Sequence, residues 1–498
     1  MKKMILVSSI LLSMLLSPNT VNAHRHSGYS DDSGVEFQNS KWMDAIRDDI
    51  KLSDLSIPGT HNTMSNGPGG DTARNQVKSL SEQLNSGIRF LDIRARVTSG
   101  KLAMHHGPIF LNSMFGDVMN GSVDFLKKNP SEVIFMRIKQ EHSTSSDQEF
   151  IKILNSYLDA PNNAPYIYQG SNRTNPSMQE MRGKIVIIRN FAGSSMGIHY
   201  NSEFDIQDNH NLSTNWDLHD YKWEPVKRQL YKANNNSHNE NKYINYLSGS
   251  GGSFPYFVAS GHSSRGTSAP RLATGLTHPG WKDSYPDFPR VDWFMGIATI
   301  AFEGTNVLTT DLIRNNNVKN NTFFSVGVIL ADFPGSGLIN NVIGLNTRHS
   351  KEDRIPDGIY SIHSTSANYK AIQFISKGRD AVIWESNDDN NQKFEFKYDY
   401  NKQAYQIFNK DGNNIIMAWN NVGNSDKVFG HPNEYKEEHY WILERSGTNM
   451  YIFKNKKDSN KVLDVHNLGQ TNGTRVKVNE RHPYEHGSAQ RFALNVNN

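Results

Sequence analysis

The sequence predicts a parallel α/β barrel followed by an all-β domain. Residues 24–346 alternate short apolar runs with longer polar stretches, whereas residues 357–498 carry a pattern that recurs about every 45 to 50 residues. The chain of 498 residues also exceeds the usual size of one hydrophobic core, so two folded units are expected.

Apolar, β-rich runs recur along the first domain. They read DLSIPGTHN, RFLDIRARV, EVIFMRIKQE, GKIVIIRNF, FPYFVAS and SVGVILADF, and the stretches SLSEQLNSG and GSVDFLKKNP between them suit helices. In (βα)8 barrels the active site lies at the carboxyl ends of the strands. The polar residues at the trailing ends of these runs are His61, Arg94, Lys139 and Asp332. Their placement indicates a site at that edge of the barrel.

Three apolar landmarks recur in the same order in the second domain. They are Tyr360, Tyr405 and Tyr451, then Ile372, Ile416 and Leu463, and finally Phe394, Trp441 and Phe492. Short strands separated by Asn, Asp and Gly turns fit an all-β structure. The charged segment 347–356, which Pro356 closes, is the predicted linker.

Composition excludes several functional classes. The formal net charge is only +3 and Lys and Arg do not cluster, so no nucleic-acid partner is expected. The absence of cysteine excludes disulfides, thiolate metal sites and a cysteine nucleophile. Apolar residues make up 36% of the chain, which is enough to fill cores, and a folded monomer is expected.

Residues 1–23 are typical of an export signal. Lys2 and Lys3 precede an apolar stretch, and Val21, Asn22 and Ala23 precede a polar sequence, so cleavage is expected after Ala23. A retained membrane anchor is the alternative, but the apolar stretch is shorter than the roughly 20 residues that a spanning helix needs. The sequence therefore predicts a secreted, extracellular protein.

Two motifs in the first domain suit proton transfer and phosphate binding. In LSIPGTHNTMS, a Pro-Gly-Thr turn presents His61, whose imidazole titrates near neutrality, although a single loop histidine can equally be structural. In RFLDIRARV, Asp92 and Arg94 are two residues apart on a strand and so point to the same face. An arginine can clamp a phosphate while a carboxylate orients a histidine; a structural ion pair is the competing interpretation.

A third motif, MHHGPIF, places His105 and His106 just beyond a short strand and before a Gly-Pro turn. A histidine pair can bind metal. Adjacent residues point to opposite faces of a strand, however, and no thiolate or HExxH helix accompanies the pair. The motif therefore favours a site without metal, and no cofactor is expected.

The order GTH, DIR, HHGP, a lysine after the next apolar strand and an aspartate beside an aromatic residue in the last strand is far more specific than any single motif. In this order the first domain resembles bacterial phosphatidylinositol-specific phospholipase C (PI-PLC), a distorted (βα)8 barrel. The resemblance implies that His61 is the general base and His106 the general acid. It implies that Arg94 contacts the phosphate where calcium sits in eukaryotic relatives, so that the enzyme is metal-independent. It also implies that Asp332 orients the base and that Asp92 partners the acid.

The reaction that the resemblance implies is an intramolecular cyclisation. His61 would remove the proton of the inositol 2-hydroxyl, which attacks phosphorus, while Arg94 and Lys139 stabilise the non-bridging oxygens. His106 would protonate the departing diacylglycerol oxygen. The expected substrates are phosphatidylinositol or glycosylphosphatidylinositol (GPI) anchors at a membrane surface, and the expected products are diacylglycerol and 1,2-cyclic inositol phosphate.

The resemblance also implies a set of substrate-binding positions, each of which could equally be an ordinary residue of the barrel rim. They are Asn62, Lys139, Glu141, Asp208, His210 and Arg189. Asn62 stands where the family commonly has an aspartate, which predicts weaker activity or an altered substrate preference. His210 stands where a tyrosine would stack on the inositol ring, and Arg189 lies one place from the family arginine. The segment after His61 lacks the exposed apolar residues of a membrane-inserting helix.

The second domain resembles the ricin B-type β-trefoil lectins, whose units close with a Gln-x-aromatic signature that occurs here as QKF and QRF. The resemblance implies a glycan ligand held by an aspartate, an aromatic platform and a late amide. Asp464 and Gln490 match two of these, the position near Asn479 is not aromatic, and Trp384 is a partial substitute. The competing interpretation is that the aromatic residues only fill the core.

Two other functions remain open. The barrel could be catalytically weakened, as Asn62 suggests, so that the chain acts as a secreted glycan-binding lectin. Alternatively, paired histidines on a barrel occur in glycerophosphodiester phosphodiesterases, which need a divalent metal held by carboxylates.

Overall fold

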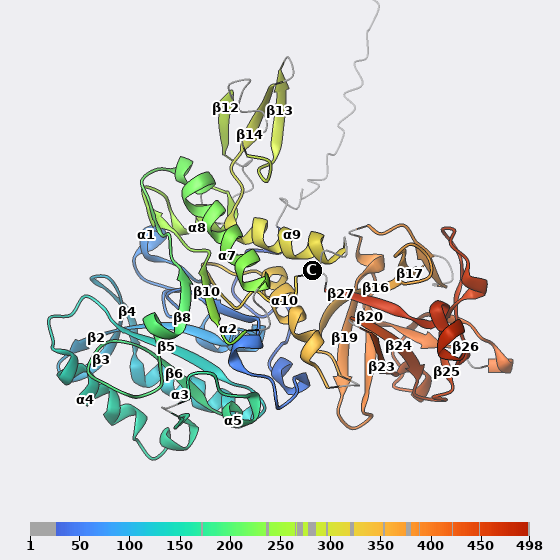
Figure 1. Cartoon of the computed structure of the whole chain (residues 1–498), viewed down its shortest axis with the longest axis horizontal. Coiled ribbons are helices and arrows are strands. Elements are labelled where there is room, and N and C mark those ends of the chain that lie inside the picture. The colour runs from blue at the N-terminus through green and yellow to red at the C-terminus, as the bar shows by residue number, and fades with distance from the viewer. Residues whose placement is uncertain are drawn as a thin grey trace, which may run out of the picture.

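The chain folds into two units that lie side by side, joined where helix α10 (Ser336–Gly344) meets the second unit (Figure 1). The structure, a computed structural model, describes residues 26–496 apart from 171–172, 236–238, 264, 266–271, 277–284, 295–296, 319–322, 352–353, 375–379, 388, 421 and 448. The predicted export signal at residues 1–23 lies outside the described residues. No helix in the described part of the chain is both long and apolar enough to cross a membrane.

The first unit is built on a curled sheet of parallel strands. These are β1 (Ile57–Thr60), β2 (Phe90–Thr98), β5 (Ile134–Gln140), β6 (Ile185–Asn190), β7 (Ile198–His199), β8 (Phe204–Gln207), β10 (Lys242–Tyr246) and β15 (Val328–Ala331). Their order is β7-β6-β5-β2-β1-β15-β10-β8, so the first and last strands along the chain are hydrogen-bonded neighbours. Among the described residues no pairing joins β7 to β8, which leaves a seam in the barrel. The predicted distorted (βα)8 barrel is confirmed.

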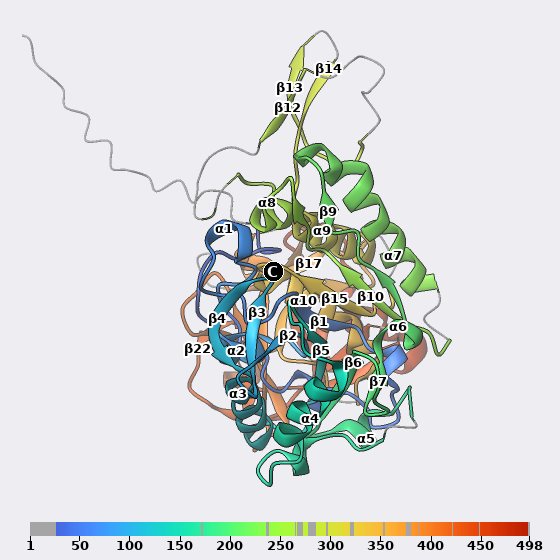
Figure 2. The same cartoon turned by 90° about the vertical axis from the view of Figure 1, so that its left-hand side faces the viewer.

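Helices surround these strands (Figure 2). They are α1 (Gly70–Ala73), α2 (Leu80–Ser86), α3 (Phe115–Lys128), α4 (Asp147–Leu158), α5 (Met178–Met181), α6 (Tyr200–Glu203), α7 (Glu224–Asn235), α8 (Pro255–Ser260), α9 (Thr305–Val318) and α10. The two stretches predicted to be helical form α2 and α3. The prediction that the run FPYFVAS is β-rich is wrong: it forms α8, which begins at Pro255, a residue that suits the first turn of a helix. Helix α2 begins with a capping box between Ser79 and Glu82 and ends at Gly87, whose φ of 113° favours glycine.

Two insertions extend from the barrel. The antiparallel hairpin of β3 (Lys101–His106) and β4 (Ile109–Met114) pairs with the second half of β2 and carries the HHG motif. The antiparallel strands β12 (Ala273–Leu276), β13 (Arg290–Phe294) and β14 (Ile297–Ala301) stand away from the barrel (Figures 1 and 2). The short strands β9 (Asn211–Leu212) and β11 (Ser250–Gly251) pair with each other outside the main sheet.

The second unit is an antiparallel β-trefoil of three four-stranded repeats. The repeats comprise β16 (Gly358–Ser364), β17 (Ala371–Phe374), β18 (Ala381–Trp384) and β19 (Phe394–Asp399); β20 (Ala404–Asn409), β21 (Ile415–Trp419), β22 (Val428–Pro432) and β23 (Trp441–Gly447); and β24 (Met450–Asn455), β25 (Lys461–Val465), β26 (Val476–Glu480) and β27 (Phe492–Val496). The tyrosines that open the units and the aromatic residues that close them are all buried in one core. The repeat predicted from the sequence is therefore the structural repeat, except that Met417 rather than Ile416 corresponds to Ile372 and Leu463, because Ile416 pairs with Phe408 as Val462 pairs with Lys454.

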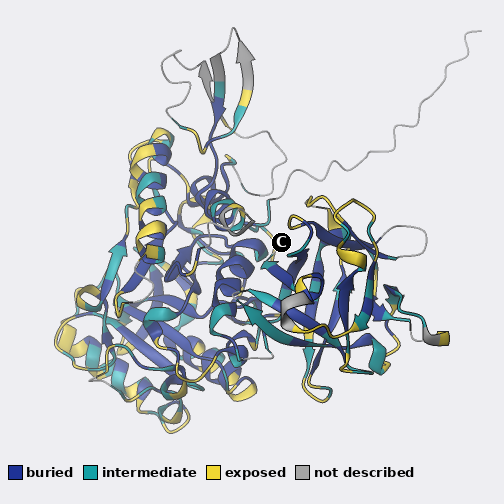
Figure 3. Cartoon of the chain, turned by 45° about the vertical axis from the view of Figure 1, so that its right-hand side comes forward, coloured by how far each residue is buried: buried dark blue, intermediate teal, exposed yellow. Residues whose placement is uncertain are grey.

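The junction between the two units is close-packed. A Cβ at Gly344, the last residue of α10, would meet the side chain of Val496 on β27, so only glycine allows this approach. Arg445 of the trefoil donates to the carbonyl of Thr347 at 2.6 Å, and the hydroxyl of Thr347 donates to Asn449 at 2.9 Å. Figure 3 shows buried segments on both sides of the junction.

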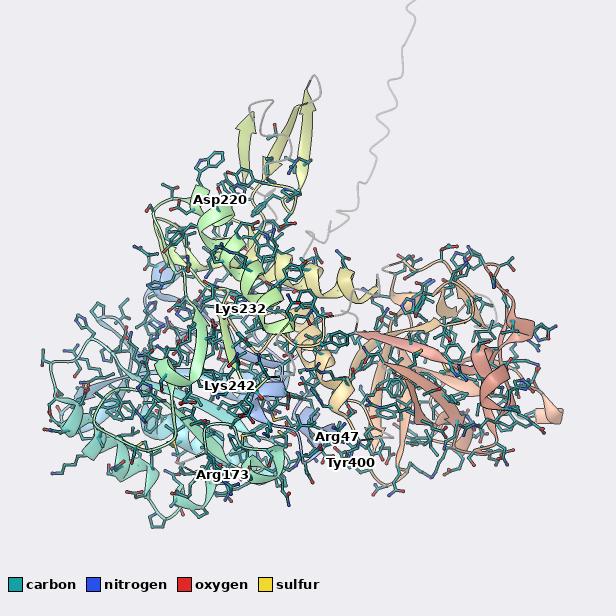
Figure 4. All side chains as sticks on the ribbon, in the orientation of Figure 1. Arg47, Arg173, Asp220, Lys232, Lys242 and Tyr400 are labelled. Carbon is teal, nitrogen blue, oxygen red and sulfur yellow. The ribbon has the colours of Figure 1, made fainter. Side chains whose placement is uncertain are left out.

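A second set of junction contacts involves Arg354, which lies in the predicted linker. Its guanidinium pairs with Asp44 of the barrel at 2.8 Å and lies over the rings of Tyr398 and Tyr400 (Figure 4 labels Tyr400). The chain forms a 3-10 helix at Leu345–His349 and enters β16 at Gly358. The division into a barrel at 24–346, a linker at 347–356 and a trefoil at 357–498 stays a prediction.

Candidate active site

A pocket of about 290 Å³ lies at the carboxyl ends of the barrel strands and collects most of the predicted site residues. It is lined by His61, Asn62, Asn75, Arg94, His106, Gly107, Arg137, Lys139, Glu141, Asp208, His210, Gly249 and Ser250. A larger pocket of about 450 Å³ is lined mainly by residues of the segment from His26 to Asn39 and contains none of the predicted residues. Convergent polar groups rather than size therefore identify the candidate site.

His61 follows β1 directly and is held from both sides. Its Nδ1 atom lies 2.8 Å from Oδ1 of Asp332, which follows β15, the parallel neighbour of β1. Its Nε2 atom lies 2.9 Å from Nη2 of Arg94 on β2. A guanidinium can only donate, so Nε2 is the acceptor and Nδ1 carries the proton that is donated to Asp332. The Nε2 lone pair of the neutral His61 ring therefore points toward the guanidinium of Arg94.

Asp92 lies beneath the pocket, and its side chain has no exposed surface. Oδ2 accepts from the backbone N–H of Asn62 at 3.1 Å and from Nε of Arg94 at 3.2 Å, while Oδ1 accepts from Nη1 of Arg137 at 2.5 Å. Burial alone would raise the pKa of Asp92, but the guanidinium groups of Arg94 and Arg137 outweigh it and hold that pKa well below its usual range. Asp92 is therefore an ionised anchor for two arginines.

The expectation that Asp92 partners His106 is wrong. Nδ1 of His106 donates instead to the carbonyl of Ala73 at 2.8 Å, the last residue of α1. The β3–β4 hairpin places this histidine next to α1, whereas Asp92 lies on β2 among the arginines. Burial lowers the pKa of His106 below its usual value, although the hydrogen bond to Ala73 acts in the opposite direction.

His105 and His106 point to opposite faces, as expected for neighbours in a strand. His105 is buried and packs against Phe110 with ring centroids 5.8 Å apart, whereas His106 lines the pocket. His105 is a packing residue.

Lys139 and Glu141 form a charged rim of the pocket beside the turn of the β3–β4 hairpin. Nζ of Lys139 lies 3.6 Å from Oε2 of Glu141, and Oε1 of Glu141 accepts from the backbone N–H of Gly107 at 3.1 Å. Oε1 also lies 3.9 Å from Nη1 of Arg94. Glu141 thus links strand β5 to the turn that follows His106.

Asn62 has a left-handed backbone with φ of 43°, a conformation that asparagine tolerates better than most residues. Its side chain is buried, and Nδ2 donates to Oδ1 of Asn75 at 3.0 Å. Asn75 follows α1 and also lines the pocket. Asn75 belongs to none of the sequence motifs, because no local pattern distinguishes it.

Asp208 and His210 lie in the loop after β8 and line the more open side of the pocket. Nδ1 of His210 lies 3.3 Å from Oδ1 of Asp208, and the two side chains are 62% and 40% exposed. Both can therefore reach a ligand that enters from solvent.

Arg189 does not line the pocket, and Arg137 does. Arg137 on β5 donates to Asp92 and, from Nη2, to Oδ1 of Asn190 at 2.6 Å. Since Asn190 points toward Arg137, its neighbour Arg189 on β6 points to the other face. The alternation of Arg137 and Lys139 along one strand was the signal in the sequence that could have identified this residue.

The trefoil brings together two of its three predicted glycan residues. Nε2 of Gln490 donates to Oδ2 of Asp464 at 2.9 Å and to the carbonyl of Glu480 at 2.8 Å. Trp384, which is 38% exposed, lies beside Gly473. The aspartate and the amide are thus positioned as a pair.

The fold and the site define a barrel protein with a pocket of paired histidines and arginines at the carboxyl ends of its strands, joined to a β-trefoil. Residues 49–191 match the family described as phosphatidylinositol-specific phospholipase C, X domain, and residues 390–479 match the ricin-type β-trefoil lectin domain-like family.

Individual proteins are similar to each part. A 1-phosphatidylinositol phosphodiesterase of Staphylococcus aureus is 30% identical over 273 residues, which cover 50% of this chain and 82% of that protein. A 1-phosphatidylinositol phosphodiesterase of Listeria monocytogenes is 42% identical over 156 residues, which cover 30% of this chain and 48% of that protein. A main hemagglutinin component type C of a Clostridium botulinum phage is 29% identical over 113 residues, which cover 22% of this chain and 40% of that protein.

Among solved structures, the phosphatidylinositol-specific phospholipase C of Listeria monocytogenes aligns with a TM-score of 0.44 and 24% identity, covering 62% of this chain and 98% of that one. The identity to the Staphylococcus aureus relative and its coverage establish the family. The chain belongs to the bacterial phosphatidylinositol-specific phospholipase C family and carries a C-terminal ricin B-type lectin domain.

Proposed function

We propose that this protein is a secreted, metal-independent phosphatidylinositol diacylglycerol-lyase. The observation that carries the proposal is the placement of His61, Arg94 and His106 around one pocket, with the proton positions of His61 fixed by its neighbours. Two histidines in one pocket can serve as base and acid for the cyclisation of an inositol phosphodiester.

His61 would act as the general base. Its Nε2 atom carries the lone pair, and once substrate displaces Arg94 toward the phosphate this lone pair can accept the proton of the inositol 2-hydroxyl. The carboxylate of Asp332 then stabilises the imidazolium that forms, because it accepts the Nδ1 proton. This is the role that the resemblance implied for Asp332.

His106 would act as the general acid toward the diacylglycerol oxygen. Its Nδ1–H is held by the Ala73 carbonyl, so Nε2 is the atom that carries the transferable proton. Bound phosphodiester would favour the imidazolium, because the negative charge opposes the effect of burial on the pKa.

Cationic side chains in the pocket are placed to meet a phosphodiester anion. Arg94 and Lys139 line it, and Arg137 beneath them shares Asp92 with Arg94. Guanidinium and ammonium donors aimed at the non-bridging oxygens would stabilise the charge that develops during cyclisation. Asn62, Glu141, Asp208 and His210 remain candidates for the inositol hydroxyls.

Metal independence is supported by the partners of the carboxylates near the proposed phosphate position, which are cationic side chains and backbone amides. Asp92 accepts from two arginines and a backbone amide, and Glu141 contacts Lys139, Arg94 and the Gly107 amide. Their charge is thus balanced by fixed cations, and Arg94 supplies the positive charge that a cation would otherwise bring.

The deciding experiment incubates the purified protein with phosphatidylinositol vesicles in EDTA and follows inositol phosphates by ³¹P NMR. The proposal predicts 1,2-cyclic inositol phosphate and diacylglycerol. Product that forms only when divalent metal is restored would favour a glycerophosphodiester phosphodiesterase, and no product in either condition would favour a lectin on an inactive barrel. A GPI-anchored protein on vesicles, tested in parallel, separates free lipid from anchor as the preferred substrate.

For the trefoil we propose glycan binding through the third unit. The Asp464–Gln490 pair offers an acceptor and a fixed amide, and burial raises the pKa of Asp464 although Gln490 opposes this. Substituting Asp464→Ala is expected to abolish retention on the glycans that the wild-type chain recognises in an array, without changing turnover of phosphatidylinositol. Loss of both together would indicate unfolding rather than a glycan site.

A further inference from the structure

The second trefoil unit contains three potential metal ligands far along the chain from the barrel pocket. His431, Glu434 and His439 offer ligand atoms that all lie within 4.8 Å of one another. In the part of the chain that the structure describes, no other group of three or more such side chains is this compact.

Three consecutive elements supply the ligands. His431 lies on β22, Glu434 in the loop after it, and His439 in a 3-10 helix at Glu437–His439. The imidazole rings of the two histidines are 5.4 Å apart between centroids. Nδ1 of His431 donates to the carbonyl of Pro432 at 2.8 Å, so its Nε2 keeps the lone pair that a metal ion needs.

The trefoil repeat places this cluster at the position that corresponds to the proposed glycan site of the third unit. The strand register places His431 opposite Ile416, as it places Asn479 opposite Val462 in the third unit. His439 precedes the closing Tyr440–Trp441 pair, as Gln490 precedes Arg491 and Phe492.

The residue that corresponds to Asp464 in the second unit is Ala418. The second unit therefore has no carboxylate–amide pair of the kind formed by Asp464 and Gln490. A buried histidine occupies the amide position instead, and it faces a second histidine and a glutamate.

We propose that His431, Glu434 and His439 bind a divalent first-row transition ion such as Zn²⁺. Two imidazoles and one carboxylate are a common zinc ligand set, and three protein ligands leave a coordination position for water or an external donor. Glu434 is exposed and His431 partly exposed, so this position faces solvent, while the buried His439 anchors the site.

A metal ion that binds here must replace interactions that Glu434 and His439 already make. Oε2 of Glu434 pairs with Nζ of Lys436 at 2.6 Å, and the backbone N–H of Glu434 donates to Nδ1 of His439 at 3.2 Å. A bound cation replaces both interactions.

The test titrates Zn²⁺ alone into the full chain, stripped with EDTA and exchanged into metal-free buffer, by isothermal titration calorimetry. One ion per chain is expected, together with a visible absorption band when Co²⁺ replaces Zn²⁺. The His431→Ala and Glu434→Gln variants are each expected to lose about tenfold or more in affinity, since even outer-shell changes at metal sites cost about 10–100-fold. The matched control is His482→Ala, an exposed trefoil histidine whose Nε2 atom lies 3.7 Å from the carboxylate of Asp464.

The results that would overturn the proposal are specific. Absence of zinc binding, or binding that His431→Ala leaves unchanged, removes the site. Zinc binding that is lost in a His106→Ala variant instead assigns the ion to the barrel. Circular dichroism and the thermal unfolding midpoint serve as the folding control for His431→Ala, since this residue lies in the trefoil.

Discussion

Nη2 of Arg94 lies 2.9 Å from Nε2 of His61, and this contact fixes the protonation of the ring. The guanidinium cannot accept a hydrogen bond, so Nε2 must, and the single proton of the neutral imidazole resides on Nδ1 against Asp332. One arginine therefore both prepares the lone pair of the base and lies where a phosphate would bind.

Substituting His61→Ala or His106→Ala is expected to reduce kcat on phosphatidylinositol by about 10²–10⁴-fold each, because each removes one proton transfer. The measurement is the initial rate of cyclic inositol phosphate release, with circular dichroism to verify folding. His142→Ala, which removes an exposed histidine outside the pocket, is the control and should retain full activity. Near-normal turnover in either catalytic variant would contradict the assignment.

Substituting Asp92→Asn should destabilise the barrel strongly. The change leaves Arg94 and Arg137 beside a neutral amide in a buried site, and breaking a buried ion pair in this way costs about 3–5 kcal/mol. Urea unfolding measures the loss. Asp49→Asn is the matched control, because Asp49 forms an exposed pair with Arg47 and such pairs contribute about 0–1 kcal/mol. Equal effects of the two substitutions would refute the anchoring role of Asp92.

The pH dependence of kcat/KM should report the acid in the free enzyme. His106 must be protonated to act, and burial lowers its pKa below the usual histidine value of about 6.5, so activity is expected to fall as pH rises through a value under 6.5. The corresponding limb of the kcat profile should lie at higher pH, because bound phosphodiester favours the imidazolium. A kcat/KM that keeps rising above pH 6.5 would argue against His106 as the acid.

His219 predicts a pH dependence of stability. It is buried against Tyr285, Phe288 and Phe302, and burial lowers its pKa to about 4. Between pH 4 and 6.5 the unfolded chain binds a proton that the folded chain does not, so the free energy of unfolding should decrease as pH falls through this window, by up to about 3 kcal/mol.

The comparison of urea unfolding at pH 7 and pH 5 tests this effect. His219→Phe keeps an aromatic ring and removes the titrating group, so its loss of stability between the two pH values should be smaller than that of the wild type. The His219→Phe variant should still lose some stability between pH 7 and pH 5, because it keeps His349, whose pKa burial lowers to about 3. An identical pH response in wild type and His219→Phe would exclude His219 as a source.

The sequence predicted much of the fold and of the site because the relevant signals are local. Asp92 and Arg94 share a face through the two-residue period of a strand, and their contact in the structure follows from that alone. The spacing of Tyr360, Tyr405 and Tyr451 likewise predicted three units, and in the structure these tyrosines are buried in one core. The positions of His61 and His106 after apolar runs placed them at the barrel mouth.

What the sequence by itself determined is the barrel strands with continuous apolar runs (β1, β2, β5, β6 and β15), the three trefoil units, and several of the polar residues that reach the strand ends. Only the tertiary structure decided that His106 bonds to Ala73, that Arg137 rather than Arg189 lines the pocket, and that His439 meets His431. The physical reason is that these contacts depend on how separate elements are registered against one another. A shift of one residue in a strand turns a side chain to the opposite face, and no local period contains that information.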